Sequence, residues 1–303
     1  MTDPTERLTE VLGQRPREVH PLGGGSNGTP YAVTAADGRR LFAKLVDGPD
    51  GPDGPDGPDG PLTVITSEAR SLLELTGAAA VGGAPVPRLV SVAADVLVTE
   101  LVEQAPPTRA AAEVFGAALA RTHRFGCPSF GATDEIYLAS ELLPTGREST
   151  DWPSFHANAR LIPFLARAEA SGGIGDRDAD AVREVVDSLP ALAGPSEPPA
   201  LLHGDLWSGN VLWTTGGGTM IDPSAYGGHR ETDLAMLALF GLPHLDTVLA
   251  SYDATFPLAA GWRDRVSLHQ VFPLLLHALL FGGSYGAATG DAARRALRGD
   301  RGS

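Results

Sequence analysis

Three oxygen-bearing side chains in the second half of the chain have a spacing that suits phosphoryl transfer. Asp205 and Asn210 lie five positions apart, and a second acid, Asp222, follows just before a proline. We expect Asp205 to accept the proton of a substrate hydroxyl. Asn210 and Asp222 offer the hard oxygen ligands that Mg²⁺ prefers beside nucleotide phosphates. The pattern therefore predicts the acceptor and metal half of a kinase site.

The segments around these residues have the composition of short buried strands. Leu201 and Leu202 precede the motif, residues 211–213 follow it, and residues 219–221 lead into the second acid. Both acids would then lie just after the ends of strands, on one face of the protein. The alternative is that they are ordinary turn formers. We favour the kinase interpretation because the complete spaced set rarely arises by accident.

Lys44 is the single lysine among the 23 basic residues of the chain. It stands in residues 39–46, where Leu41, Ala43 and Leu45 occupy alternate positions as they do in a strand. A flat guanidinium cannot replace a compact ammonium that reaches a phosphate. Codon bias would explain why lysine is rare, but not why it remains at this position. We therefore predict that Lys44 holds the nucleotide phosphates.

A glycine-rich segment precedes this strand and has the spelling Gly-x-Gly-x-x-Gly. It consists of Gly23, Gly24, Gly25, Ser26, Asn27 and Gly28. The spelling alone also fits a dinucleotide-binding fold, but that fold needs a helix directly after the glycines. Residues 29–34 are instead rich in strand formers and contain Pro30. The glycines thus join two strands, as in the hairpin that covers the phosphates of kinases.

The next helical pattern covers residues 67–75, with Leu72 and Leu75 facing inward. Glu68 stands one turn before Leu72, and we expect it to pair with Lys44. Its alternative role is that of an acid in the first helical turn, where the helix dipole favours a negative charge.

Residues 201–210 and 226–235 together resemble the fructosamine kinases, also called ketoamine kinases. The His-Gly-Asp frame with its later Asn and Asp is shared by the wider protein-kinase-like superfamily, which includes aminoglycoside phosphotransferases and choline kinases. The Trp-Ser-Gly element at 207–209 and the Gly-His-x-Glu-x-Asp-Leu-Ala run at 228–235 are similar to this branch in particular. The resemblance extends from about residue 17 to the last helices.

This resemblance implies a bilobal, protein-kinase-like α+β fold that uses ATP and Mg²⁺. A small β-rich N-terminal lobe would span residues 1–102, and a larger, mostly helical lobe would span residues 103–303. In the hinge between them, the backbone carbonyl of Glu100 and the amide of Val102 would meet adenine. Trp207 would line the acceptor pocket, where an indole can pack on a sugar ring or face its amine.

The resemblance also separates structural residues from catalytic ones. Asp233 precedes an apolar helical run, and its carboxylate suits bracing the backbone of the catalytic loop. We interpret His203 and His229 as structural histidines whose nitrogens are hydrogen-bonded.

Two segments depart from the family pattern. Some relatives carry a cysteine in the glycine loop that makes them redox-sensitive, whereas residues 25–27 contain none, so we expect that switch to be absent. Residues 137–147 lack the family's Gln-x-Asn element near the acceptor. The family pattern that comes after this segment is present at Trp152, Phe155, Arg160 and Leu161. The chemistry of phosphoryl transfer is thus better defined than the identity of the acceptor.

The rest of the chain is consistent with a large helical lobe. We expect helices over residues 108–124, 152–170 and 176–189, and several more after Glu231. Residues 47–61 repeat Asp-Gly-Pro five times, which predicts an extended, mobile loop without a packed core.

Charge and cysteine content narrow the partners and the compartment. The net charge is −14, of which five charges come from the aspartates of the Asp-Gly-Pro tract. An acidic chain is disfavoured as a partner of nucleic acid or an anionic membrane. No signal peptide is present, and the apolar stretch 271–281 is too short to span a bilayer. The single cysteine, Cys127, excludes an internal disulfide and fits the reducing cytoplasm.

The site residues predict an ATP-dependent kinase. The resemblance to the fructosamine kinases implies that it phosphorylates the third-carbon hydroxyl of a ketosamine, on a small glycated amine or a glycated protein, and so leads to deglycation. One alternative is a phosphotransferase for an aminoglycoside or an amino alcohol. Another is a nucleotide-binding pseudokinase, against which the complete set of Lys44, Asp205, Asn210 and Asp222 argues.

Overall fold

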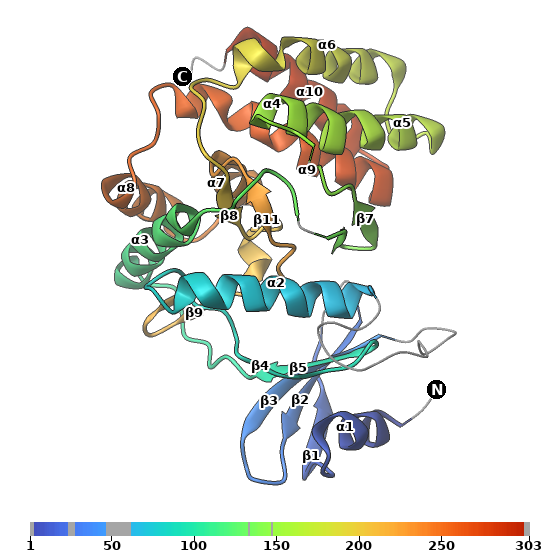
Figure 1. Cartoon of the computed structure of the whole chain (residues 1–303), viewed down its shortest axis with the longest axis vertical. Coiled ribbons are helices and arrows are strands. Elements are labelled where there is room, and N and C mark those ends of the chain that lie inside the picture. Colours follow the sequence, from blue (N-terminus) through green and yellow to red (C-terminus); the bar gives the residue numbers. More distant parts are fainter. Residues whose placement is uncertain (1–2, 24–27, 47–61, 133, 147, 300–303) are drawn as a thin grey trace.

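The computed structural model describes residues 3–23, 28–46, 62–132, 134–146 and 148–299. A sheet with its flanking helices forms one end of the molecule and a helical region forms the other, with α2 (Val64–Ala79) between them (Figure 1). This is the bilobal α+β arrangement that the sequence predicts. The Asp-Gly-Pro tract at 47–61 lies outside the described residues.

The N-terminal lobe is built on an antiparallel sheet with the strand order β1-β2-β3-β5-β4. Its strands are β1 (Glu18–Pro21), β2 (Thr29–Thr34), β3 (Arg40–Leu45), β4 (Leu89–Val92) and β5 (Val96–Glu100). On β3, Leu41, Ala43 and Leu45 enter a core shared with α1 (Pro4–Leu12). Side chains alternate across a strand, so Phe42 and Lys44 face the space between the lobes.

Helix α2 starts earlier than the apolar pattern alone indicates. The Thr63 hydroxyl accepts a hydrogen bond from the Thr66 amide at 3.1 Å, and the Thr66 hydroxyl accepts one from the Thr63 amide at 2.8 Å. This reciprocal cap satisfies two amides at the helix start. Glu68 consequently lies in the second turn rather than the first, where the helix dipole contributes less. Leu72 and Leu75 are buried, as predicted.

The C-terminal lobe contains the helices that the sequence predicts and three two-stranded sheets. The helices are α3 (Arg109–Phe125), α4 (Trp152–His156), α5 (Ile162–Ala170), α6 (Asp176–Leu192), α7 (Glu231–Phe240), α8 (Leu245–Thr255), α9 (Val266–Phe281) and α10 (Tyr285–Arg298). The strand pairs are β6 (Ile136–Leu138) with β7 (Glu141–Leu143), β8 (Ala200–Leu202) with β11 (Tyr226–Gly228), and β9 (Val211–Thr214) with β10 (Gly217–Met220).

The predicted helix over 152–170 is interrupted by a π-helical turn, Ala157–Leu161, between α4 and α5. Such turns are uncommon and often occur at functional positions. Arg160 on this turn is fully buried, with its guanidinium over the rings of Phe155 and Tyr226. It donates a hydrogen bond to the Pro144 carbonyl at 2.9 Å, directly after the β6–β7 hairpin. The turn thus anchors a hairpin that reaches the site described below.

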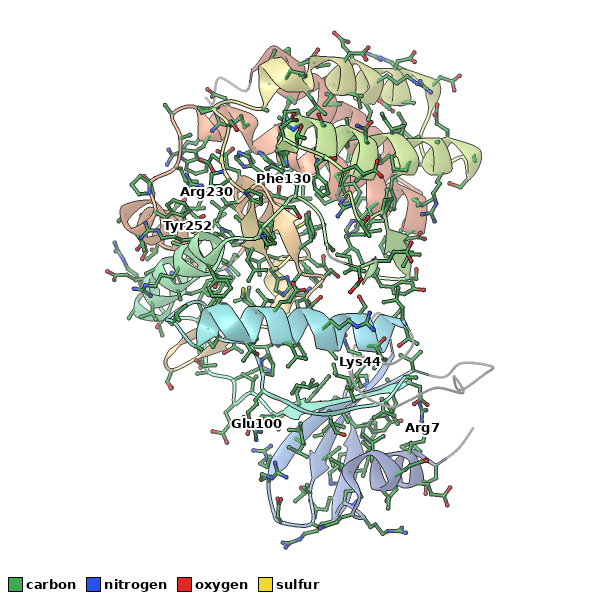
Figure 2. The ribbon with its side chains drawn as sticks, viewed as in Figure 1. Arg7, Lys44, Glu100, Phe130, Arg230 and Tyr252 are labelled. Carbon is green, nitrogen blue, oxygen red and sulfur yellow. The ribbon has the colours of Figure 1, made fainter. Side chains whose placement is uncertain are left out.

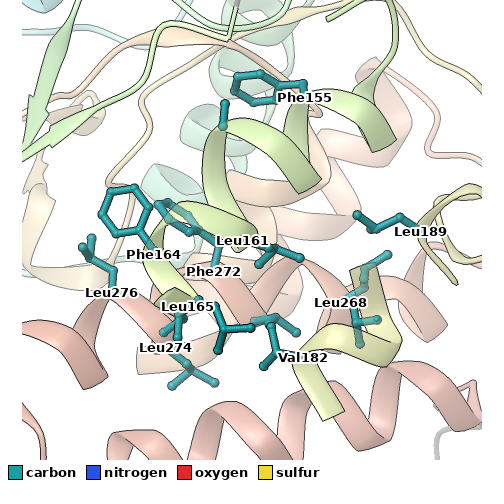
Figure 3. Packing of buried hydrophobic residues seen from close by; sticks show 14 of the residues in the cluster. Phe155, Leu161, Phe164, Leu165, Val182, Leu189, Leu268, Phe272, Leu274 and Leu276 are labelled. Carbon is teal, nitrogen blue, oxygen red and sulfur yellow. The ribbon is translucent and has the colours of Figure 1, made fainter. Parts of the chain in front are cut away.

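Helix α9 is the centre of the largest core cluster. Figure 3 shows Phe272 of α9 beside Phe164 of α5, and their ring centroids are 5.3 Å apart. Leu268 of α9, Phe155 and Leu161 belong to the same buried cluster. The apolar stretch 271–281 is therefore a core helix, as predicted. Within the described part of the chain, no helix has both the length and the apolar character needed to cross a bilayer.

Candidate active site

The loop between β8 and β9 carries Asp205 and is fixed by hydrogen bonds to Asp233. Asp233 of α7, which is almost completely buried, accepts hydrogen bonds from the amides of His203 at 2.7 Å and Gly204 at 3.1 Å. Gly204 has φ +82°, and a Cβ there would lie 2.1 Å from the Ser224 carbonyl oxygen, so only glycine fits. Asp233 thus braces the loop, as predicted. Burial opposes its ionisation, but hydrogen bonds from His123 and from the backbone hold its pKa below the ordinary value.

His203 uses both ring nitrogens within the protein. Nε2 donates to the Ile221 carbonyl at 2.9 Å, and Nδ1 accepts from the Asp205 amide at 3.3 Å. The ring therefore ties the loop of Asp205 to the residue that precedes Asp222. This confirms its interpretation as a structural histidine.

Asp205 and Asn210 are in direct contact. The Asn210 amide nitrogen donates to the Asp205 backbone oxygen at 2.8 Å and to its carboxylate oxygen Oδ2 at 3.1 Å. The carbonyl oxygen of the Asn210 side chain is then left for another partner. Burial and the nearby charge of Asp222 raise the pKa of Asp205 to about 7. A carboxylate with a raised pKa, held in a fixed loop, is suited to take a proton.

Lys44 of strand β3 brings a positive charge to the same site, beside Asp222. Lys44 Nζ donates to Glu68 Oε2 at 2.7 Å and to Asp222 Oδ1 at 2.9 Å, so it bridges the two lobes (Figure 2). The predicted contact between Lys44 and Glu68 is therefore present. Burial by itself would lower the pKa of Lys44, but the two carboxylates raise it above its ordinary value. Burial raises the pKa of Glu68 to about 7, and Lys44 opposes that rise.

The oxygen atoms left over suit a magnesium ion. Asp222 uses Oδ1 for Lys44, which leaves Oδ2, and its side chain is 35% exposed. Asn210 offers its side-chain carbonyl oxygen, because its nitrogen is already engaged with Asp205. Hard oxygen ligands from one or two side chains beside phosphates are the usual arrangement for Mg²⁺. Asp222 also has φ +54°, a backbone conformation found disproportionately at functional sites.

A cleft of about 590 Å³ between the lobes contains most of the predicted residues. Its predicted lining residues are Gly23, Gly28, Lys44, Glu68, Glu100, Val102, Trp207, Asn210 and Asp222. Gly24, Gly25, Ser26 and Asn27 lie outside the described residues. Gly28 has φ +135°, and a Cβ there would lie 2.8 Å from the Leu45 carbonyl oxygen, so the chain requires glycine where it enters β2.

The hinge leaves one backbone donor available. The Glu100 amide donates to the Arg88 carbonyl and the Leu101 amide to the Arg40 carbonyl. The amide of Val102 has no hydrogen-bond partner among the described residues. This is the group that we expect to meet adenine. Apolar side chains absent from the sequence prediction, including Phe42, Leu97, Leu212 and Ile221, line the same cleft.

Asp205 lies in a second, smaller pocket of about 40 Å³ that adjoins the cleft. Lys44, Trp207 and Asp222 line both spaces. Tyr137 also lines the small pocket, and sequence reasoning missed it. The backbone amide of Tyr137 donates a hydrogen bond to Ser67 Oγ, and its carbonyl accepts one from Ser224 Oγ at 2.7 Å. The apolar alternation of residues 136 and 138 was the signal that could have revealed this hairpin.

A second buried cluster joins His229, Glu231 and His269, whose ligand atoms lie within 4.8 Å of one another. Arg265 occupies both carboxylate oxygens of Glu231, at 2.6 and 2.9 Å. The Nδ1 atom of His229 accepts a hydrogen bond from the Glu231 amide, so its proton lies on Nε2. The guanidinium of Arg265 and the protonated nitrogen of His229 both disfavour the binding of a metal cation here. We therefore interpret the cluster as structural. This agrees with the prediction for His229.

The chain is similar to known kinases that act on small molecules. The family model described as fructosamine kinase matches residues 2–298. A crystal structure of a candidate fructosamine-3-kinase from Thermobifida fusca is 43% identical, with a TM-score of 0.87 over 98% of this chain and 99% of that one. A macrolide 2'-phosphotransferase type I has a TM-score of 0.58 at 17% identity, covering 96% of this chain and 97% of its own, which shows a shared fold alone.

Among curated proteins, a "probable ketoamine kinase" from Enterococcus faecium is 35% identical over 189 residues, covering 62% of this chain and 68% of that protein. The alignments to two further ketoamine kinases, from Lactiplantibacillus plantarum and Vibrio parahaemolyticus, span 62% and 58% of those proteins.

Proposed function

The chain belongs to the fructosamine kinase family of small-molecule kinases, and from this premise we propose that it transfers the γ-phosphoryl group of ATP to a hydroxyl of a ketosamine. The acceptor hydroxyl is the one on the third carbon of the sugar. Phosphorylation there prepares the product to break down and release its amine, which gives the enzyme a role in deglycation.

The observation that carries this proposal is the position of Trp207. Its side chain is 40% exposed, lines the cleft and also lines the small pocket of Asp205. An exposed indole beside a catalytic carboxylate offers an apolar, π-rich face to a sugar ring and its cationic amine. The acceptor hydroxyl can therefore reach Asp205 while the sugar lies against Trp207.

Each half of the site has a distinct task in the transfer. Asp205 orients the acceptor hydroxyl and takes its proton as the bond to phosphorus forms. Lys44, fixed by Glu68, places a positive charge at the phosphate oxygens. Asn210 and Asp222 would hold the magnesium ion. Mg²⁺, when bound, neutralises negative charge on the phosphates.

The nucleotide base would lie at the other end of the cleft. The free amide of Val102 and the carbonyl of Glu100 supply a donor and an acceptor for adenine, between the apolar side chains of Phe42 and Leu212. This arrangement places the phosphates toward Lys44 and leaves the small pocket of Asp205 for the acceptor hydroxyl.

The direct test incubates the protein with Mg²⁺, ATP and a fructosyl- or ribulosyl-amine and follows sugar phosphate formation by mass spectrometry. We expect a phosphorylated ketosamine that forms at the same rate as ADP. The Trp207→Ala variant should raise the KM of the ketosamine several-fold more than the KM of ATP. Readily phosphorylated aminoglycoside or choline, with no phosphorylated ketosamine, would contradict the proposal.

A further inference from the structure

A row of five aromatic side chains leads away from the acceptor pocket over the helical lobe. This aromatic row consists of Trp207, Phe240 at the end of α7, His277 and Phe281 on α9, and Tyr285 at the start of α10. The ring centroids of Trp207 and Phe240 are 6.0 Å apart, and those of Phe240 and His277 are 5.3 Å apart. His277 lies 5.5 Å from Phe281 and 5.0 Å from Tyr285. The rings thus form one continuous set.

The outer part of the row is exposed, and none of the described elements covers it. Phe281 is 67% exposed and Phe240 is 37% exposed. Among the described residues, four Phe or Trp side chains are strongly exposed, and three of them, Trp207, Phe240 and Phe281, belong to this row. A gathering of exposed apolar side chains at one place marks a binding surface more often than a scattered set does.

The row carries no formal charge. His277 Nδ1 donates a hydrogen bond to the Pro273 carbonyl at 2.7 Å, which places the proton of the neutral ring on Nδ1 and leaves Nε2 as an acceptor. Burial lowers the pKa of His277, so the ring is neutral at pH 7. The row therefore offers aromatic faces and edges with one hydrogen-bond acceptor, which suits an apolar group attached to an N–H.

The nucleotide does not account for this surface. Phe240, His277, Phe281 and Tyr285 do not line the interlobe cleft, whose walls come from the sheet, the hinge, α2 and the segment 207–222. Among the described residues, the row joins the site through Trp207, which lines the small pocket of Asp205 as well as the cleft. A group that extends from an acceptor at Asp205 can therefore reach the row.

We infer that the aromatic row binds the group carried on the amine of the ketosamine, and that it selects apolar, above all aromatic, amine substituents. This inference rests on the proposed function. With the sugar hydroxyl at Asp205 and the sugar against Trp207, the amine is directed along the row. A benzyl group would then reach beyond Trp207 to Phe240, the next ring of the row, whereas a methyl group would end at Trp207.

The test compares two ketosamines that differ only in this group, N-methyl- and N-benzyl-fructosamine. Both amines are secondary and carry the same charge. We expect the parent enzyme to have a kcat/KM several-fold higher for the benzyl compound. Loss of one aromatic contact changes binding by a factor of about three to ten, so Phe240→Ala should lower the benzyl-to-methyl ratio of kcat/KM by that factor. Because Phe240 is exposed and is the last residue of α7, the variant should fold normally.

Phe125→Ala is the matched control. Phe125 is 52% exposed at the end of α3 and belongs to neither the cleft nor the aromatic row. Its variant should keep the parent ratio. Equal kcat/KM for the two compounds in the parent, or an unchanged ratio in Phe240→Ala, would overturn the inference and leave the proposed function intact. Absence of turnover with both compounds would overturn the proposed function and this inference with it.

Discussion

Lys44 and Arg265 are both buried cations paired with a glutamate, but their surroundings differ. Lys44 bridges Glu68 and Asp222, and the side chain of Asp222 is 35% exposed to the cleft. Arg265 meets both oxygens of Glu231, and the side chains of this pair are only 9% and 3% exposed. We call the first set the site network and the second, with His229 and His269, the structural network.

The two networks differ in what they leave available. An ammonium has three donors, and Glu68 and Asp222 use two of those of Lys44, so one is free for a phosphate oxygen. The planar guanidinium of Arg265 forms a bidentate pair that completes the coordination of Glu231. This pair holds the pKa of Glu231 down at about 2, together with His269, although burial opposes its ionisation. A network that is complete in itself can stabilise the fold, but only an incomplete one can bind a ligand.

The largest effect on turnover is expected from replacing Asp205. Asp205→Asn removes the proton acceptor but keeps the shape of the side chain, so turnover should fall by about 10²–10⁴. Asp205 does not line the main cleft, so the affinity for ATP should stay close to that of the parent. Steady-state kinetics and calorimetric ATP titration measure the two quantities. Asp187→Asn, at an exposed position of α6, is the control. Near-normal turnover of Asp205→Asn would remove Asp205 from the mechanism.

The next effect tests whether the site network requires an ammonium. Lys44→Arg keeps the charge, but a guanidinium is too large to bridge Glu68 and Asp222 and still reach a phosphate. We expect kcat to fall on the order of 10²-fold. The matched control is Arg40→Lys on the same strand, where the side chain is 66% exposed. If Lys44→Arg is folded and fully active, the single lysine reflects codon history alone.

Arg265→Met should instead affect stability. Removing one partner of a buried pair leaves the other charge uncompensated, which costs about 3–5 kcal/mol of the free energy of unfolding. The KM for ATP of the folded fraction should not change, because Arg265 lies outside the cleft. Urea denaturation measures the change, and Arg183→Met, in the exposed pair with Glu169, should be nearly neutral. A stable Arg265→Met enzyme without activity would show that the two networks are not separate.

The structural network also predicts a dependence of stability on pH. Burial and the neighbouring His269 lower the pKa of His229 to about 3, so the folded state favours its neutral form. The unfolded chain binds a proton near pH 6.5, and stability is therefore complete above pH 6.5 and falls as the pH drops toward 3. At pH 5 the loss from His229 is about 2 kcal/mol, since one pKa unit corresponds to about 1.4 kcal/mol.

Urea midpoints at pH 7.5, 6.5, 5.5 and 5.0 test this dependence. Glu231 stays ionised over this range because its pKa lies at about 2. The His229→Asn variant should have a flatter profile, whatever its absolute stability. A parent profile without slope between pH 6.5 and 5.0 would contradict a neutral, buried His229.

The sequence predicted the parts of the site that lie close together in the chain. The spacing of Asp205 and Asn210 is set by one loop, and the residue types alone identify their chemistry. The bracing role of Asp233 followed from its place at the start of an apolar helix. These features depend on local geometry and on side-chain chemistry, which a sequence displays directly.

The contact between Lys44 and Glu68 was predicted, but other features that depend on contacts between distant segments were not. The hydrogen bond from Lys44 to Asp222 joins residues 178 positions apart, and the aromatic row joins three helices to the catalytic loop. The π-helical turn at 157–161 has no sequence signal of its own, because it depends on how Arg160 packs among aromatic rings. The early start of α2 was missed because the cap at Thr63 precedes the clear apolar pattern.

The smallest effect is expected from residues 47–61, which lie between Lys44 and Glu68 of the site network along the chain. Lys44 is fixed by the pairing of β3 with β2 and β5, and Glu68 is fixed by the cap of α2 at Thr63. Neither anchor uses the Asp-Gly-Pro tract, and the length of a loop changes its closure entropy only slowly. Replacing residues 47–61 with a short Gly/Ser linker should therefore leave the melting temperature and the steady-state constants close to those of the parent. A control linker of fifteen Gly and Ser residues separates the effect of length from that of charge. If both linkers weaken ketosamine binding equally, the five aspartates take part in recruiting the cationic amine, and the site network would then extend beyond Lys44, Glu68 and Asp222.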